Sequence, residues 1–288
     1  MNYKQYHNPV LISPLVEHFG VENDSIVLDG TLGFGGHASE ILSRFPSVAY
    51  LGFDRDVFAL KKASERCNKY INFKSIKGSF SSMIDYSHEN KINITHILLD
   101  LGVSSYQIDQ SERGFTFQKD EPLDMRMDLS GKVTAKDILL TYTPEQLEDL
   151  FSGGGDIRHP SKLVDRIIEK RSNQSLNTSF DLLDCVKRSF YHRSRQQYIA
   201  TATRVFQAIR IEVNQEFDEL NKILADILTL KGVTIAIITF QPNEDRLIKS
   251  FIKENNLKTV KKKPFMASYH ECKKNPREKT AKLRIFYV

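Results

Sequence analysis

The residues best suited to chemistry are an aspartate and a group of glycines that follow a short apolar run. They lie in "IVLDGTLGFGGHASEIL" (26–42), which begins with the pattern of a strand and ends with the pattern of a helix. Its candidate ligand-binding residues are Asp29, Gly33, Gly35, Gly36 and His37. Glycines at a strand-to-helix turn allow positive φ and let a ligand reach the main chain where a Cβ would collide. The stretch therefore predicts a loop that binds a small molecule.

The glycine spacing narrows the class of that ligand. A phosphate loop of the Walker type needs Gly-Lys-Ser/Thr, and here Gly36 is followed by His37. The run "GFGGHA" still matches a permitted variant of the dinucleotide fingerprint. On the glycines alone, nicotinamide or flavin binding therefore stays open.

Two carboxylates favour S-adenosylmethionine over a dinucleotide. Asp29 stands four residues before Gly33, which resembles the acid-then-glycine loop of methyltransferases, where the acid helps to place the methionine half. Asp54 closes the next apolar run, 25 residues after Asp29. A carboxylate there can accept hydrogen bonds from both ribose hydroxyls, a role that NAD enzymes share. We therefore predict that both aspartates contact the cofactor.

Two later segments add further candidates. Phe80 in "GSF" (78–80) is expected to pack on the adenine, with a place in the core as the alternative. The segment "LLDLGVSSYQ" (98–107) follows an apolar run, and strand carboxyl ends in a doubly wound sheet face the ligand crevice. Asp100 and Gln107 are therefore expected beside the reacting centre, together with the serines between them.

The elements that must position these residues alternate in the first part of the chain. Strands are predicted at 25–30, 48–54 and 94–102, another ends before Gly78, and helical spacing lies between them. This alternation predicts a parallel sheet built from βαβ units. From 106 to 198 helical patterns dominate, and strand patterns return at 233–240 and 281–288. The fold class is thus α/β and doubly wound, with a helical insert.

Capping signals locate several helices of this pattern. Asp56 is placed to cap the helix that follows the second strand, and "TPEQLEDLF" (143–151) combines an N-cap Thr143, Pro144 at the first helical position and Gln146 closing a capping box. Apolar residues recur every three or four positions from Val205 to Ile227. That spacing predicts one long amphipathic helix or a pair of helices.

Composition excludes several classes of protein. The chain has 288 residues, of which 40% are hydrophobic and 27% are charged, which is typical of a globular protein. It has no apolar run long enough to span a membrane and no apolar leader. We therefore expect a soluble, cytoplasmic protein with no membrane partner. Its three cysteines show no Cys-x-x-Cys spacing, and we expect no metal site. From Arg246 to Arg284 there are 13 Lys or Arg against three acids, which favours either a contact with phosphates or a solvated basic face.

Seven motifs occur in an order that resembles a known family. They are "HNPVL" (7–11), "DGTLGFGGH" (29–37), "LLDLGVSS" (98–105), "RGFTF" (113–117), "PLDMRMD" (122–128), "ATRVFQAIRIEVNQE" (202–216) and "NPREKTAKLR" (275–284). Together they are similar to the bacterial MraW or RsmH family, the cytosine-N4 methyltransferases of small-subunit ribosomal RNA. The resemblance implies a Rossmann-like, class I S-adenosylmethionine-dependent methyltransferase, with a decoding-site cytosine of 16S ribosomal RNA, free or in the small subunit, as its substrate.

The resemblance also implies a division of labour along the chain. We expect residues 1–105 and 200–288 to form a discontinuous cofactor-binding domain, and 106–199 to form an insert that recognises the substrate. The residues expected to contact RNA come from the matching motifs and from the basic segment: Arg113, Arg126, Arg204, Asn214, Lys261, Lys262, Lys263 and Arg277. The target base must leave its stack to reach the methyl group.

Methyl transfer to cytosine N4 needs alignment and an acceptor for an amino proton. Our catalytic candidates are Asp100 at the strand end and Asp124 in "PLDMRMD". Each has an alternative role. Asp100 is also a candidate cofactor contact, and Asp124 could pair with Arg126 or Arg113 and hold the insert in place.

Some positions depart from the family pattern and leave other functions open. They are Tyr106, the segment "GGGD" (153–156), and Gln241, Pro242 and Asn243 in "TFQPNEDR". One alternative is therefore a small-subunit assembly factor that kept the fold and lost the chemistry. Another is an NAD-dependent oxidoreductase, although no convincing proton-relay pair is present.

Overall fold

The computed structural model describes residues 9–109 and 112–288, so the first two residues of "HNPVL" lie outside the described residues. By its contacts the chain divides into two compact units. The sheet unit consists of residues up to Val103 and of Asp218–Val288, and the helical unit consists of Ser104–Phe217. Each unit is described by itself.

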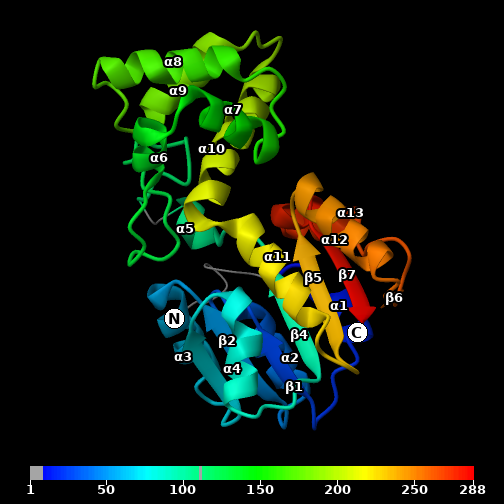
Figure 1. The fold of residues 1–288 in the computed structure, drawn as a ribbon. Coiled ribbons are helices and arrows are strands. Elements are labelled where there is room, and N and C mark those ends of the chain that lie inside the picture. The colour runs from blue at the N-terminus through cyan, green and yellow to red at the C-terminus, as the bar shows by residue number, and fades with distance from the viewer. Residues whose placement is uncertain (1–8, 110–111) are drawn as a thin grey trace. The chain divides into compact units, whose positions relative to one another are not determined.

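The sheet unit is built on a seven-stranded sheet with the order β3-β2-β1-β4-β5-β7-β6 (Figure 1). Its strands are β1 (Ile26–Asp29), β2 (Ala49–Asp54), β3 (Phe73–Lys77), β4 (His96–Asp100), β5 (Thr234–Thr239), β6 (Lys258–Thr259) and β7 (Lys282–Tyr287). β1 to β5 are parallel, and β7 runs antiparallel to β5 and to β6. The order reverses between β1 and β4, which is the point where ligands bind in doubly wound sheets.

Helices cover both faces of this sheet because its central strands are apolar on both sides. Leu98 belongs to the hydrophobic cluster on one face, whereas its neighbours Ile97 and Leu99 belong to the cluster on the other. One face packs against α1 (Ile12–His18), α2 (Gly36–Arg44) and α3 (Val57–Cys67), and the other against α4 (Met83–Glu89), α11 (Glu216–Ile227) and α12 (Pro242–Glu254). Near-continuous apolar strands are typical of parallel sheets buried on both faces. The predicted α/β, Rossmann-like class is confirmed.

The helical unit has a separate core. Its helices are α5 (Ser105–Asp109), α6 (Ala135–Thr141), α7 (Pro144–Gly153), α8 (Ser161–Ser172), α9 (Ser179–Ser189) and α10 (Arg195–Asn214). Threonines begin three of them in capping boxes, Thr134 at α6, Thr143 at α7 and Thr178 at α9. Their apolar faces meet in one buried cluster that includes Leu147, Ile167, Leu182 and Ile209.

The boundary of the helical unit depends on α10. The apolar pattern from Val205 to Ile227 forms a pair of helices, because Gln215 adopts φ 52° and ends α10 before α11 begins. The predicted boundary at residue 200 falls inside α10. The division by contacts lies at Phe217 instead, since buried α10 residues such as Val205 and Ile209 pack in the helical core.

Two sequence expectations can be compared directly with local structure. Asp56 caps α3 and accepts a hydrogen bond from the Phe58 N–H at 2.9 Å, and Thr143 and Gln146 form the predicted capping box. The two-residue strand β6 was not predicted, because so short a strand leaves no periodic pattern. Within the described part of the chain, no helix combines the length and the apolar character needed to cross a bilayer.

Candidate cofactor and active site

Three aspartates end three adjacent strands of the sheet unit. Asp54 ends β2, Asp29 ends β1 and Asp100 ends β4. Because the three strands are parallel, their carboxyl ends lie at the same edge of the sheet. The structure therefore brings together three of the residues that the sequence proposed for the cofactor.

Asp29 is held firmly by its own neighbourhood. It is 1% exposed, and its Oδ2 accepts a hydrogen bond from the Tyr50 hydroxyl at 2.7 Å. Its Oδ1 accepts from the Thr31 backbone N–H at 3.0 Å. Thr31 in turn uses its Oγ1 to accept from the Asp100 backbone N–H at 2.5 Å, so it ties the ends of β1 and β4 together. Burial raises the pKa of Asp29 to about 6.

Asp54 fixes the glycine loop. Its Oδ2 accepts a hydrogen bond from the Gly33 N–H at 2.8 Å, and its Oδ1 accepts from the Asp56 N–H at 2.8 Å. Burial raises the pKa of Asp54 to about 6. The Arg55 N–H also donates to this carboxylate. A carboxylate can accept about four hydrogen bonds, so capacity for a ribose hydroxyl remains. Asp54 thus shapes the loop and remains chemically suited to its predicted role.

The glycines of the loop serve backbone geometry and close packing. Gly35 is the residue before α2 and has φ 70°. A Cβ at this position would lie 3.3 Å from Ala63 and from the Cys67 sulfur of α3, so a side chain would press α2 away from α3. Gly33 precedes it at φ 52°, and Gly36 opens α2 as a buried residue. This geometry explains the glycine spacing that the sequence shows.

His37 lies in the first turn of α2 beside Asp100. It is 5% exposed, and its Nε2 donates to the Val10 carbonyl at 3.0 Å, because a carbonyl can only accept. Its Nδ1 is 3.7 Å from Asp100 Oδ2. Burial lowers the pKa of His37, so the ring is neutral at pH 7 and its Nδ1 faces the aspartate as an acceptor. The pair is therefore two close polar groups without a formed ion pair.

Asp100 has a carboxylate oxygen that accepts no hydrogen bond from the described residues. Its side chain is 11% exposed, and Oδ1 is buried without a hydrogen-bond partner among residues 9–109 and 112–288. Burial raises the pKa of Asp100 to about 7, and the positive charge of Arg277 partly offsets that rise. A buried oxygen without a partner is costly and commonly marks a binding or reacting position.

The residues at this edge fit a cationic adenosine cofactor. The orphaned Asp100 oxygen and the remaining lone pairs of Asp54 are acceptors, and the buried Asp29 carboxylate adds negative charge. This set suits a ligand that carries an amino group, a sulfonium and ribose hydroxyls. Phe80, the first residue of the short helix η2 (Phe80–Ser82), is partly buried against the hydrophobic cluster of Leu28 and Leu99. It is thus at least partly a core residue, which was the alternative to its predicted adenine contact.

Gln107 belongs to the helical unit and lies in α5. It is 6% exposed, and its side-chain oxygen accepts a hydrogen bond from the Ser104 N–H at 2.9 Å. The Gln107 N–H donates to the Ser104 hydroxyl at 3.2 Å. This reciprocal pair begins α5, and a cofactor contact by Gln107 stays a prediction.

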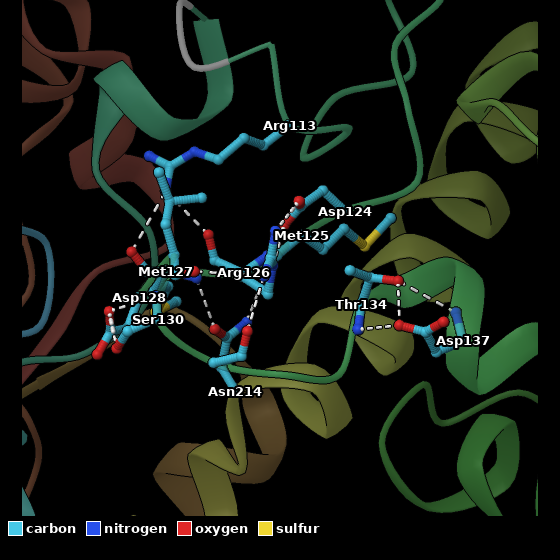
Figure 2. Close-up of polar contacts among 12 residues, drawn as sticks. Arg113, Asp124, Met125, Arg126, Met127, Asp128, Ser130, Thr134, Asp137 and Asn214 are labelled. Atoms are coloured by element: carbon cyan, nitrogen blue, oxygen red, sulfur yellow. Dashed lines mark hydrogen bonds and ion pairs between the residues drawn. The ribbon is translucent and has the colours of Figure 1, made fainter.

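Asp124 forms a bidentate ion pair within the helical unit (Figure 2). Arg126 donates from Nε to Asp124 Oδ1 at 2.9 Å and from Nη2 to Oδ2 at 2.7 Å. Its backbone N–H also donates to Oδ1 at 2.9 Å, and these contacts keep the pKa of Asp124 below its ordinary value despite partial burial. The geometry favours the structural alternative for Asp124 and makes it a weak base. A catalytic role for Asp124 stays a prediction, and this ion pair argues against it.

Other residues predicted to contact RNA hold the same segment together (Figure 2). Arg113 Nη1 donates to the Arg126 carbonyl at 2.9 Å. On either side of Arg126, Asn214 of α10 donates to the Met125 carbonyl and accepts from the Met127 N–H. Gly114 has φ 75°, and a Cβ there would lie 2.3 Å from the Pro122 carbonyl oxygen. The segment from Arg113 to Gly131 is thus a closely bonded loop whose backbone needs this glycine.

The remaining predicted RNA contacts are on exposed or partly exposed surface. Arg204 is exposed on α10, and Lys261, Lys262 and Lys263 are exposed between β6 and β7. Arg277 lies in the short helix η3 (Pro276–Lys279), where its charge acts on Asp100. The lysines and Arg277 therefore belong to the sheet unit, and Arg204 belongs to the helical unit.

The departures at 241–243 coincide with the start of a helix. Gln241 is the N-cap of α12, Pro242 is its first residue, and Gln241 and Glu244 form a capping box. Glu244 Oε2 also accepts a hydrogen bond from the Phe240 N–H at 3.0 Å. These residues form a well-capped helix start. The segment Gly153–Asp156 lies at the end of α7.

Two residues of the edge were missed from the sequence. Thr31 lies inside the glycine motif, and a threonine directly after Asp-Gly was the available signal for a polar bridge. Tyr50 gave no local signal, because its bond to Asp29 depends on the pairing of β1 with β2. Long-range pairs of this kind cannot be read from one segment.

Elsewhere in the sheet unit, a hollow of about 330 Å³ lies between α11 and α12 and is lined by residues such as Leu224, Leu247 and Phe251. It is separate from the aspartate edge in sequence and in lining residues. Among the described residues, no cluster of three or more His, Cys, Asp or Glu is arranged to hold a metal ion. The aspartate edge is thus the best-defined chemical site.

Comparison with known proteins matches the chain over nearly all of its length. The model of the MraW methylase family matches residues 4–288. A protein of Picosynechococcus sp. described as ribosomal RNA small subunit methyltransferase H is 40% identical over 284 residues, covering 97% of this chain and 95% of that one. Relatives with the same description from Persephonella marina and Thermotoga neapolitana are 36% and 37% identical, over 97% and 98% of this chain and 98% and 96% of theirs.

Proposed function

The chain belongs to the MraW methylase family, and on that premise we propose that it transfers a methyl group from S-adenosylmethionine to the exocyclic N4 of a decoding-site cytosine in 16S ribosomal RNA. The observation that carries this proposal is the buried Asp100 Oδ1, which has no partner among the described residues and stands at the reversal point of the sheet. The names of the relatives support the small-subunit RNA as substrate.

Different residues of the chain bind different parts of the cofactor. The Gly33–Gly36 loop lets a ligand approach the backbone, and Asp54 accepts a hydrogen bond from a ribose hydroxyl with the capacity that its loop contacts leave over. Asp29, fixed by Tyr50 and Thr31, supplies negative charge for the methionine half. S-adenosylmethionine, when bound, supplies an activated methyl group on a sulfonium.

The chemical task left to the protein is to align the cytosine amino group and to accept its proton. The N4 lone pair is conjugated into the ring, so an acceptor that withdraws an amino hydrogen favours the reactive form of the nitrogen. Asp100 Oδ1 accepts that proton, because a pKa of about 7 balances availability of the base against its strength near neutral pH. Neutral His37 lies against the other Asp100 oxygen and limits its rotation.

The substrate is held by cations outside this edge. Lys261, Lys262 and Lys263 contact backbone phosphates, and Arg277 contributes positive charge next to Asp100. We expect the reaction to take place in the cytoplasm, where small ribosomal subunits are found. The helical unit recognises the RNA around the target base.

The proposal is tested with small subunits from cells that lack this activity. They are incubated with the protein and methyl-deuterated S-adenosylmethionine, and their nucleosides are analysed by mass spectrometry. Labelled N4-methylcytidine is the expected result. Label on another nucleoside would keep the methyltransferase and overturn the target atom. Absence of label, with cofactor and subunits both shown to bind, would instead identify an assembly factor without chemistry.

A further inference from the structure

The corner between α9 and α10, residues 187–195, is largely exposed, and it contains none of the residues that the sequence predicted to contact RNA. The segment from Cys185 to Ile211 contains six Lys or Arg, at 187, 188, 193, 195, 204 and 210, and no Asp or Glu. The rest of the helical unit has ten basic residues against 17 acids. Four of the six lie at the corner itself, at 187, 188, 193 and 195, whereas Arg210 lies in the last two turns of α10 and pairs with Glu216 at 2.8 Å. Positive charge is therefore concentrated at the corner of an otherwise acidic unit.

Side chains at the corner alternate between the core and the solvent. Phe190 and Tyr198 pack against the hydrophobic cluster of the helical unit, and His192 stacks edge-on against Tyr198 with ring centroids 5.1 Å apart. Between them, Tyr191 is 87% exposed and Arg193 is exposed as well. The inward residues anchor the segment, and the outward pair is presented to solvent.

The backbone of the corner is fixed by hydrogen bonds. Gln197 accepts from the Arg193 N–H at 2.8 Å through its side-chain oxygen, and its own N–H donates to the Ser194 hydroxyl at 3.2 Å. These two contacts set the path of the chain into α10, with Arg195 as the first helical residue. Tyr191, Arg193 and Arg195 are thus carried on an ordered turn, which lowers the entropy cost of binding through them.

The outward residues of the corner are not engaged by other described residues. Arg188 pairs with Asp184 at 2.8 Å, whereas Lys187, Arg193 and Arg195 form no ion pair with residues in 9–109 or 112–288. The Tyr191 ring, 87% exposed, likewise has no aromatic or cationic neighbour in those ranges. By contrast, Tyr269 of the sheet unit is 78% exposed but has Lys273 Nζ over its ring at 4.9 Å. Tyr191 offers an open aromatic face beside unpaired cations.

From these features we propose that the α9–α10 corner binds single-stranded RNA, with a base stacked on Tyr191 and phosphates held by Arg193 and Arg195. An aromatic face beside unpaired arginines is the combination that binds single strands without reading their sequence. The concentrated positive charge favours a partner rich in phosphates, such as RNA, over a protein surface with few acidic residues. The inference rests on the proposed function for the identity of the RNA, while the binding itself is measured without methyl transfer.

The test uses the full chain and a fluorescein-labelled oligouridine of about 12 nucleotides, within the range of site sizes for single strands. Anisotropy titrations at several salt concentrations give the affinity and its salt slope. Tyr191→Ala is expected to weaken binding about 5- to 150-fold with little change of slope, and Tyr191→Phe to bind like the wild type. The double variant Arg193→Gln, Arg195→Gln is expected to lower the slope by about 1.4.

A matched control removes the same charge elsewhere on the helical unit. Lys132→Gln with Arg166→Gln changes two exposed cations outside the 185–211 segment and is expected to leave the slope unchanged. All variants alter exposed side chains, so their melting temperatures should equal that of the wild type.

Three results would overturn the inference. The Tyr191 and arginine variants could bind the oligouridine as the control does, or the control could lose as much slope. Alternatively, the Tyr191 and arginine variants could bind naked RNA normally and lose only their binding to assembled subunits. That result would mean that the corner binds a ribosomal protein. Absence of methyl transfer by the wild type would contradict the proposed function and leave these binding results valid.

Discussion

The predicted catalytic aspartates of the two units differ in their hydrogen-bond partners and in the direction of their pKa shifts. In the sheet unit, Asp100 keeps a buried oxygen without a partner among the described residues, and burial raises its pKa to about 7. In the helical unit, Asp124 is bound by Arg126 through both oxygens, and its pKa is held below the ordinary value. Both aspartates are partly or largely shielded from water, so the difference lies in their partners.

This difference separates a group that can react from a group that holds a loop. A carboxylate that is paired with an arginine has little basicity left and is stabilised as an anion. A carboxylate that is buried without a partner stays basic and gains from any ligand that satisfies it. The same contrast holds for cations, since Lys261, Lys262 and Lys263 are exposed, whereas Arg113 and Arg126 bond backbone carbonyls.

The largest expected effect is on methyl transfer by the Asp100→Asn protein. Loss of the proton acceptor should lower kcat by about 10²- to 10⁴-fold, while the affinity for S-adenosylmethionine changes by less than about tenfold. Single-turnover assays on small subunits, together with calorimetric titration of the cofactor, separate these quantities. If the cofactor affinity fell as far as the rate, Asp100 would be a cofactor contact.

The next effect is on the pH dependence of stability. The folded-state pKa of Asp100 is raised, so its contribution to stability is present below pH about 4 and is lost as pH rises through about 7. Asp100→Asn should therefore be more stable than the wild type by about 2–4 kcal/mol at pH 8, and about equally stable at pH 4. Urea unfolding at several pH values measures this, and equal curves at pH 8 would contradict the burial of an unsatisfied charge.

A smaller effect is expected from Asp124→Asn, the matching change in the helical unit. Breaking the partly exposed pair with Arg126 should cost about 1–2 kcal/mol of unfolding free energy, because the loop from Arg113 to Gly131 loses a bidentate contact. Methyl transfer should change less than about tenfold. A loss of activity as large as that of Asp100→Asn, with stability intact, would reverse the comparison.

The smallest effect concerns the exposed cations. Changing Lys261, Lys262 and Lys263 to Ala should weaken RNA binding and reduce its salt slope by up to about 2, without altering the melting temperature. Arg126→Gln is the contrasting variant, since it should lower the melting temperature and leave the slope unchanged. An unchanged slope in the lysine variant would assign those lysines to an idle surface.

Local patterns in the sequence were sufficient for most of the fold. The strand ends at Asp29, Asp54 and Asp100 could be read because apolar runs stop there, and the caps at Asp56 and Thr143 follow from side-chain chemistry within a few residues. The pair of helices α10 and α11 was only partly predicted. Nothing in the periodicity indicates that Gln215 takes a left-handed conformation and divides them.

The role of each site residue was harder to predict, because it depends on partners distant in sequence. The bond of Tyr50 to Asp29 and the two bonds of Asn214 to the backbone near Met125 join segments that only the fold brings together. The choice between Asp100 and Asp124 was open on residue type alone. Their neighbours, which raise one pKa and lower the other, distinguish them.

The most direct test of this account is the pH dependence of kcat/KM for methyl transfer, measured for the wild type, Asp124→Asn and Asp100→Asn. This parameter reports groups of the free protein, so the wild type should gain activity as pH rises through about 7, where Asp100 loses its proton. Asp124→Asn should show the same rise, and Asp100→Asn should show a low rate without it. A rise that persists in Asp100→Asn, or disappears only in Asp124→Asn, would contradict the assignment.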